Sequence, residues 1–278
     1  MDGMTAVIDV RGLRKAYGGR DAVAGIDLHV AGGEVFALLG PNGAGKTTTV
    51  EILEGHRRRD SGDVTVLGVD PGTARRSWRA RIGIVLQTAT DAADLTVREM
   101  VRHVAGFYPR PRRADEVIEM VGLSSRAKSR IRTLSGGQRR RLDVALGVVG
   151  RPDVLFLDEP TTGFDPEARR QFWQLIRAEA VRGTTILLTT HYLDEAEALA
   201  DRLAVIAAGR IVAEGSPASL GGRATARATV SWNGGTEHTA DPTTLIERLA
   251  ADGADLSTLT VRRPTLEDMY LTLIGEQR

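Results

Sequence analysis

One short stretch of the chain combines flexible backbone with a single lysine. Residues 38–53 read LLGPNGAGKTTTVEIL, and three glycines there precede Lys46. Of the 37 basic residues, only Lys15, Lys46 and Lys128 are lysines, so Lys46 stands out in a chain that otherwise uses arginine. Glycine leaves backbone N–H groups accessible, and a helix N-terminus adds a positive dipole end. The stretch therefore predicts a loop that surrounds a polyphosphate.

The loop matches G-x-x-x-x-G-K-[ST] in full, between an expected strand and an expected helix. The compact ammonium of Lys46 is expected at the β- and γ-phosphates, where the wider arginine fork would fit differently. Thr47 is expected to bind Mg²⁺, and Thr48 to hydrogen-bond an α-phosphate. The residues of the predicted loop are Gly40, Pro41, Asn42, Gly43, Ala44, Gly45, Lys46, Thr47 and Thr48.

Two adjacent carboxylates follow an apolar run further along the chain. In DVLFLDEP (153–160), Asp158 and Glu159 come directly after four apolar residues. A buried carboxylate is costly unless it faces a metal or another charge, although such a pair can also cap the next helix. With a phosphate loop upstream, Asp158 is expected to hold Mg²⁺ and Glu159 to act as general base on the attacking water.

A second glycine-rich helix start lies between these two motifs. Residues 134–138 read LSGGQ, and they open a segment with helical composition. Helix N-termini bind anions, so the chain carries two phosphate-type sites but only one lysine loop.

Composition limits the class of protein. The 278 residues have a net charge of +1, 42% hydrophobic residues and no cysteine, as expected for a soluble globular protein without disulfides or thiolate metal sites. Neither a signal peptide nor an apolar run long enough for a membrane span is apparent, so any membrane role is expected to come through a partner. The arginine triplets 57–59 and 139–141 are interpreted as solvated faces, and nucleic acid is not expected as a partner.

Strands and helices are expected to alternate, which predicts an α/β fold with a mainly parallel sheet. Residues 95–150 are expected to form a mostly helical insertion. The last 60 or so residues are expected to form a small α+β unit. Its final helix is predicted from an apolar stripe and a Thr265–Asp268 capping pair, and it packs on its own unit or serves an assembly contact. The expected strands are 6–10, 34–40, 63–68, 81–87, 153–160, 184–190, 202–206, 210–214, 226–232 and 257–262.

The order of these motifs resembles the ATPase domains of ABC transporters, over roughly residues 6–220. The resemblance implies a P-loop NTPase fold of the ABC ATPase type, with an antiparallel β part and a helical subdomain at about 88–150. It predicts an ATP-binding domain at 1–220 and a C-terminal extension at 221–278. ATP and Mg²⁺ are the implied cofactors, and ATP hydrolysis is the implied activity.

The resemblance also implies roles for single residues. Tyr17 matches the aromatic residue that stacks on adenine, and Gln87 matches a glutamine that senses Mg²⁺ and the membrane subunit. Asp165 matches an aspartate of the loop that links two protomers, and His191 matches the histidine that contacts the γ-phosphate. Ser135, Gly136, Gly137 and Gln138 would face the nucleotide of a second, head-to-tail protomer.

The segment 135–166 and the terminal PTLEDMYLTLIG resemble drug-resistance exporter ATPases of the daunorubicin type, which work with separate ABC-2 type permeases. This implies a peripheral position on the inner face of the cell membrane. LTVREM (95–100) is expected to receive a permease helix, with Val97 and Met100 as crosslinking positions, or simply to start a helix capped by Thr96. A ribosome- or DNA-acting ABC ATPase and a non-catalytic regulator are the alternatives, and the transported substrate is not encoded in these motifs.

Overall fold

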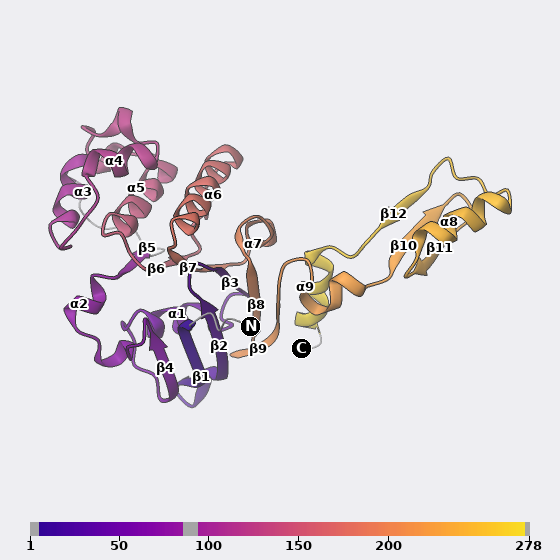
Figure 1. The fold of residues 1–278 in the computed structure, drawn as a ribbon, viewed down its shortest axis with the longest axis horizontal. Helices are drawn as coiled ribbons and strands as arrows, with labels where there is room; N and C mark the ends of the chain where they lie inside the picture. The colour runs from indigo at the N-terminus through magenta and orange to yellow at the C-terminus, as the bar shows by residue number, and fades with distance from the viewer. Residues whose placement is uncertain (1–5, 86–93, 276–278) are drawn as a thin grey trace. The chain divides into compact units, whose positions relative to one another are not determined.

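The computed structural model describes residues 6–85 and 94–275, in two compact units, Met1–Val212 and Ala213–Arg278. Figure 1 shows the elements of both units. Each unit is described by itself below.

A six-stranded sheet forms the centre of the first unit, in the order β5-β6-β7-β3-β8-β9. The pairs β5–β6, β6–β7, β3–β7 and β3–β8 are all parallel, which confirms the expected mainly parallel sheet. The strands are β3 (Val35–Leu39), β5 (Ile82–Val85), β6 (Val154–Asp158), β7 (Thr185–Thr190), β8 (Arg202–Ala207) and β9 (Arg210–Gly215).

The register of this sheet brings three chemically important segments to one edge. Leu39 pairs with Thr190, and Asp158 pairs with Thr189, so the neighbouring strands β3, β7 and β6 end together. The phosphate loop follows β3, His191 follows β7, and Glu159 follows β6. Ligands of α/β proteins bind at the carboxyl ends of parallel strands, so we expect a ligand-binding site at this edge.

An antiparallel sheet of order β2-β1-β4 lies beside the first sheet (Figure 1). Its strands are β1 (Ala6–Tyr17), β2 (Arg20–Ala31) and β4 (Ser61–Val66). Gly18 and Gly19 have φ of 54° and 79°, as a tight hairpin turn requires. The sequence predicted only residues 6–10 of β1 and did not predict β2. Several register shifts interrupt the β1–β2 ladder and weaken the alternation that would have revealed it.

Helices flank the large sheet and form a separate helical part between β5 and β6. The expected helical insertion is confirmed by three helices, and two of them begin with a capping box: Thr96–Glu99 before α3 and Ser135–Gln138 before α5. The helices of the first unit are α1 (Lys46–Leu53), α2 (Arg76–Arg79), α3 (Val97–Ala105), α4 (Ala114–Met120), α5 (Gly136–Val148), α6 (Pro166–Val181) and α7 (Leu193–Leu199).

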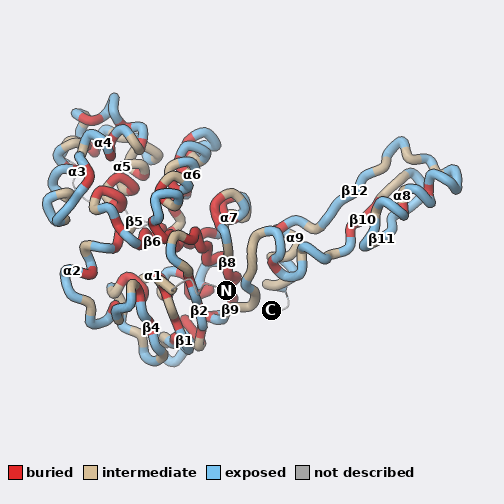
Figure 2. The backbone as a smooth tube through the Cα atoms, in the orientation of Figure 1, coloured by how far each residue is buried: buried red, intermediate tan, exposed pale blue. Residues whose placement is uncertain are grey.

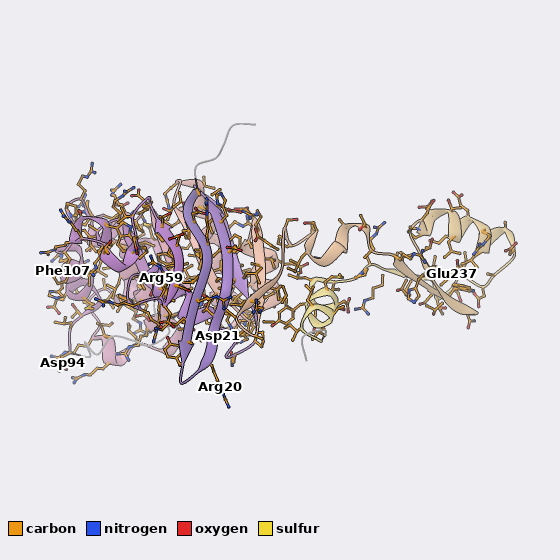
Figure 3. The ribbon with its side chains drawn as sticks, turned by 90° about the horizontal axis from the view of Figure 1, so that it is seen from below. Arg20, Asp21, Arg59, Asp94, Phe107 and Glu237 are labelled. Atoms are coloured by element: carbon orange, nitrogen blue, oxygen red, sulfur yellow. The ribbon has the colours of Figure 1, made fainter. Side chains whose placement is uncertain are left out.

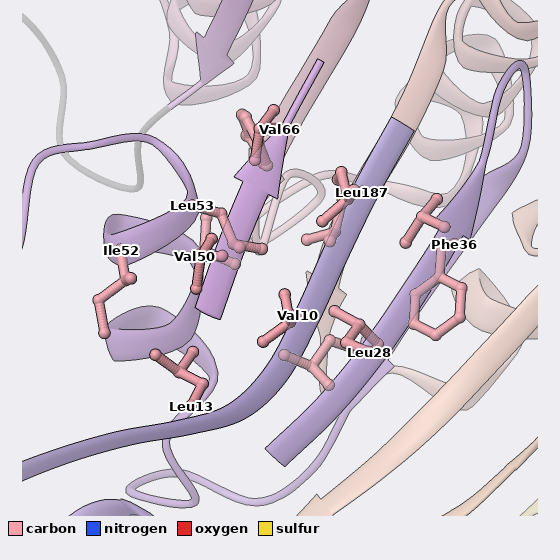
Figure 4. Close-up of a cluster of buried hydrophobic side chains, with 14 of the residues drawn as sticks. Val10, Leu13, Leu28, Phe36, Val50, Ile52, Leu53, Val66 and Leu187 are labelled. Atoms are coloured by element: carbon pink, nitrogen blue, oxygen red, sulfur yellow. The ribbon is translucent and has the colours of Figure 1, made fainter. Parts of the chain in front are cut away.

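A large core cluster of described residues lies between the two sheets, around α1. Figure 2 marks buried residues along the sheet strands, and Figure 4 shows the apolar side chains that meet there. Leu28 of β2, Leu53 of α1 and Phe36 of β3 belong to one buried cluster. The apolar face of α1 thereby fixes the helix whose N-terminus carries the phosphate loop.

In its described residues the second unit contains a three-stranded antiparallel sheet, in the order β11-β10-β12, two α-helices and the short 3-10 helix Leu220–Thr225. Val230 of β10 packs with Leu245 and Leu249 of α8 in a small core. The predicted Thr265–Asp268 cap is confirmed, because Thr265 N and Oγ1 both donate to the Asp268 carboxylate at 2.8 Å. The elements are β10 (Ala228–Trp232), β11 (Gly235–Thr239), α8 (Pro242–Ala251), β12 (Thr260–Arg262) and α9 (Leu266–Gly275). Within the described ranges of both units, no helix is both long and apolar enough to cross a membrane.

Candidate nucleotide site

The phosphate loop connects β3 to α1, and its glycines are required by close packing. Gly45 is the N-cap of α1 with φ of 106°, a left-handed conformation that favours glycine. A Cβ on Gly45 would lie 2.3 Å from Ala22 O, and one on Gly40 would lie 2.3 Å from Ile206 O. The loop can therefore run against β2 and β8 only with glycine at both positions.

Lys46 is held at the base of this loop. Its Nζ donates to Gly40 O at 2.7 Å and to Pro41 O at 3.2 Å, and the residue is only 5% exposed. Burial lowers the pKa of Lys46, an effect that the nearby carboxylates of Glu159 and Asp158 partly oppose. The ammonium is thus surrounded by acceptors and placed where a phosphate oxygen would add a further one.

The two carboxylates follow β6 as expected, and each has its own partners. Asp158 Oδ1 accepts a short hydrogen bond from the Thr189 hydroxyl, which lies on the neighbouring strand β7. Glu159 Oε1 lies 3.8 Å from Lys46 Nζ and 3.2 Å from His191 Nδ1. The structure therefore brings three predicted residues, Lys46, Glu159 and His191, to one point.

A cleft of about 490 Å³ opens beside these groups. It is lined by Tyr17, Ala22, Asn42, Gly43, Gly45, Lys46, Thr47, Thr48 and Glu159. Tyr17 is 43% exposed at the end of β1, and the guanidinium of Arg57 lies 5.4 Å from its ring centroid. A flat exposed ring beside a phosphate loop can stack on a nucleobase while the loop holds the phosphates.

The LSGGQ segment forms a second helix tip, at the start of α5. The Ser135 hydroxyl accepts from Gln138 N at 3.3 Å, and Gln138 Oε1 accepts from Ser135 N at 3.1 Å. Among the described residues, those that line the cleft do not include 135–138. Asp165 lies elsewhere again, as the N-cap of α6, where its carboxylate accepts from Ala168 N at 2.8 Å. Gln87, the remaining predicted residue, lies outside the described residues.

Two buried groups beside the site were not predicted. Arg140 is 8% exposed, so the interpretation of 139–141 as a solvated face is wrong at this position. A helical pattern could have revealed it, because Arg140, Val144 and Val148 recur every four residues and are all buried. Glu54 is 3% exposed at the end of α1, and burial, assisted by Asp158 and Glu51, raises its pKa to about 8.

A lysine loop after one parallel strand and paired carboxylates after another define a P-loop nucleoside-triphosphate hydrolase. Comparisons with known proteins agree with this class. The family described as "ABC transporter" matches residues 23–162. The daunorubicin/doxorubicin resistance ATP-binding protein DrrA of Streptomyces peucetius is 47% identical over 221 residues, which cover 78% of this chain and 67% of the relative. The Nod factor export ATP-binding protein I of Rhizobium meliloti is 36% identical over 301 residues, covering 98% and 89%.

Solved structures show the same fold. An ATP-binding subunit of an ABC transporter superposes with a TM-score of 0.73 at 22% identity, covering 96% of this chain and 99% of that chain. An ATP-binding cassette in a dimeric post-hydrolysis state with ADP and Pi superposes with a TM-score of 0.68 at 23% identity, covering 75% and 98%. The chain belongs to the ABC transporter family. It is an ATP-hydrolysing cassette of the kind found in exporter systems.

Proposed function

We propose that this chain is the ATPase subunit of an exporter whose membrane part is a separate ABC-2 type permease. Two copies would pair head to tail, with two ATP molecules bound at the interface between them, which we call the seam. Hydrolysis would separate the two copies at the seam and move the permease. The names of the relatives, which refer to resistance and to export, support the direction of transport. A drug-like substrate is the first choice, because two daunorubicin resistance proteins are 47% and 38% identical to this chain. The chain would then act at the cytoplasmic face of the membrane.

The observation that carries the paired arrangement is the open glycine tip of α5. Apart from the chain neighbours and the backbone of α5 itself, an added Cβ at Gly136 or Gly137 would meet no described atom within 4 Å, and neither residue has a positive φ. The protomer itself therefore gives no steric or conformational reason for glycine at either position. Close approach of another body is the remaining physical reason, and a phosphate at a helix N-terminus satisfies it.

The residues around the cleft fit a magnesium-bound triphosphate. Asp158 is buried at the strand end with one carboxylate oxygen bonded to Thr189, and Thr47 is among the residues that line the cleft. Hydroxyl and carboxylate oxygens are the ligands that Mg²⁺ prefers, so Thr47 and Asp158 would hold the ion, together with Gln87 by analogy with the family. When bound, the ion would neutralise charge on the β- and γ-phosphates.

The other side chains have separate roles in hydrolysis. Lys46 would bind the β- and γ-phosphate oxygens, and the backbone N–H groups of the loop would surround the rest of the triphosphate. Glu159 would take a proton from the attacking water, and His191, 3.2 Å from Glu159, would contact the γ-phosphate. Tyr17 would stack on adenine, Ser135 to Gln138 would complete the partner's site, and Asp165 would lie in the loop between protomers.

The residues suited to crosslinking at the proposed permease contact differ from those expected from the sequence. Val97 and Met100 are buried, at 0% and 6% exposure, so they are wrong choices for crosslinking. They lie on the buried face of α3, and two apolar residues that flank this helix are exposed instead. Leu95 and Phe107 are 38% and 57% exposed and apolar, and Phe107 is labelled at the outer edge of the helical part in Figure 3. We propose these two as the crosslinking positions.

Replacing Glu159 with Gln tests the catalytic assignment. The E159Q protein should bind ATP with an unchanged dissociation constant, lose at least about 100-fold in kcat, and form an ATP-dependent dimer in sedimentation. E119Q, which changes an exposed carboxylate on α4, is the matched control and should behave as wild type. Wild-type turnover in E159Q would remove Glu159 from this role. Copurification of the chain with a membrane permease, and its crosslinking through Leu95 or Phe107, tests the transport assignment separately.

A further inference from the structure

Arg140 of α5 binds the turn that carries the catalytic carboxylate. Its Nη2 donates to Asp158 O at 2.7 Å and to Glu159 O at 3.3 Å, and its Nε donates to Pro160 O at 2.9 Å. One guanidinium therefore contacts three consecutive carbonyl groups directly after β6. Backbone groups beyond a strand end have no sheet partner, so buried carbonyls there need another donor.

The turn that Arg140 binds is conformationally strained. Glu159 has φ of 44°, which side-chain-bearing residues rarely adopt and which persists only when the surrounding structure enforces it. On the other side, Glu159 N donates to Thr189 O at 3.1 Å and to Thr189 Oγ1 at 3.2 Å. The peptide groups of this turn are thus held between Thr189 of β7 and Arg140 of α5, and this conformation directs the Glu159 carboxylate toward Lys46 and His191.

We propose that Arg140 is a positioning residue for Glu159 and makes the geometry of the general base depend on the placement of α5. An arginine is required because its planar fork presents several donors at fixed angles, so it can reach three carbonyl groups at once. A lysine would carry the same charge but would hold the turn through a single nitrogen atom.

A further consequence rests on the paired arrangement of the proposed function. Arg140 lies one helical turn after the Gly136–Gly137 tip, in the single continuous helix Gly136–Val148. If the tip meets the partner's nucleotide, binding there moves or fixes the same helix that holds the Glu159 turn. The general base of one site then responds to occupancy of the other site, so turnover at one site depends on nucleotide at the other.

The test compares R140K and R140Q with the control R141K. Arg141 belongs to the same triplet, but it donates to the Gln171 side chain at 2.7 Å, away from the cleft, so R141K should keep wild-type turnover. In R140K and R140Q, we expect kcat to fall at least about tenfold while the ATP dissociation constant changes by less than threefold. If both variants lose nucleotide binding as well as turnover, Arg140 is a general structural support and the proposal is wrong.

A double-mutant cycle identifies the residue through which Arg140 acts. In the E159Q background, R140K should cause little further loss of the residual rate, because the group it positions is already disabled. An equal loss in both backgrounds would overturn the proposal.

Cooperativity tests the coupling. R140K should lower the Hill coefficient for ATP relative to R141K while leaving ATP-dependent pairing intact in the E159Q background. An unchanged Hill coefficient would refute the coupling, whereas no pairing of the E159Q protein itself would refute the proposed dimer instead.

Discussion

Substitution of Gly137 by Ala should separate the stability of the protomer from its ability to pair. Outside the backbone of α5 and the chain neighbours, the added Cβ meets no described atom within 4 Å, and Gly137 lies in the first turn of α5 without a positive φ. Alanine is favoured over glycine in helices by about 0.5–1 kcal/mol, and less in the first turn. We therefore expect the isolated protomer to gain up to about 0.5 kcal/mol in the free energy of unfolding.

At the proposed seam the same methyl group should have the opposite effect. Overpacking a close contact costs about 1–3 kcal/mol, which corresponds to roughly 5- to 150-fold weaker pairing. Urea unfolding without nucleotide measures the first quantity, and sedimentation of G137A in the E159Q background with ATP measures the second.

A glycine of the opposite kind provides the control. A Cβ on Gly83 would lie 2.2 Å from Gly147 O, so G83A should destabilise the protomer by about 1–3 kcal/mol. A G137A protein that is clearly less stable than wild type, or that pairs and hydrolyses ATP normally, would refute the argument that the tip is glycine for the sake of a second molecule.

Three further predictions concern stability. Burial raises the pKa of Glu54 from 4.5 to about 8, so the folded state binds this proton more tightly than the unfolded state. In metal-free buffer the free energy of unfolding should therefore fall as pH rises, by at most about 3 kcal/mol between pH 5 and 7. Urea unfolding at several pH values should show a weaker dependence of this free energy on pH in E54Q. The buried Glu179 accepts two hydrogen bonds from Arg112, of 2.9 and 2.7 Å, and keeps a third from Arg182 at 2.7 Å. R112M should therefore lower the free energy of unfolding by about 1.5–3 kcal/mol in chemical denaturation, and a loss of less than about 1 kcal/mol would contradict the argument. Phe156 is fully buried in β6, so F156A should lower the free energy of unfolding by about 3–5 kcal/mol. V181A, at a residue that is 88% exposed, should leave this free energy almost unchanged.

Local patterns in the sequence were enough for the chemistry of each motif. The phosphate loop needs its glycines and lysine within eight consecutive residues, and the Thr265–Asp268 cap needs two residues three apart. Such features are set by backbone conformation and neighbouring side chains, so they can be recognised without knowledge of the fold. The apolar run before Asp158 likewise predicted a buried strand at 153–160, which the structure has at Val154–Asp158.

The tertiary structure alone decided how these motifs meet. Strand register places the ends of β3, β6 and β7 side by side, although Leu39 and Thr190 are 151 positions apart in the sequence. Burial was equally non-local. Val97 and Met100 face the helical core, and Arg140 lies beneath the Glu159 turn. The physical reason is that a side chain's environment depends on which distant element packs over it, and an arginine is buried only where backbone carbonyls from another segment receive it.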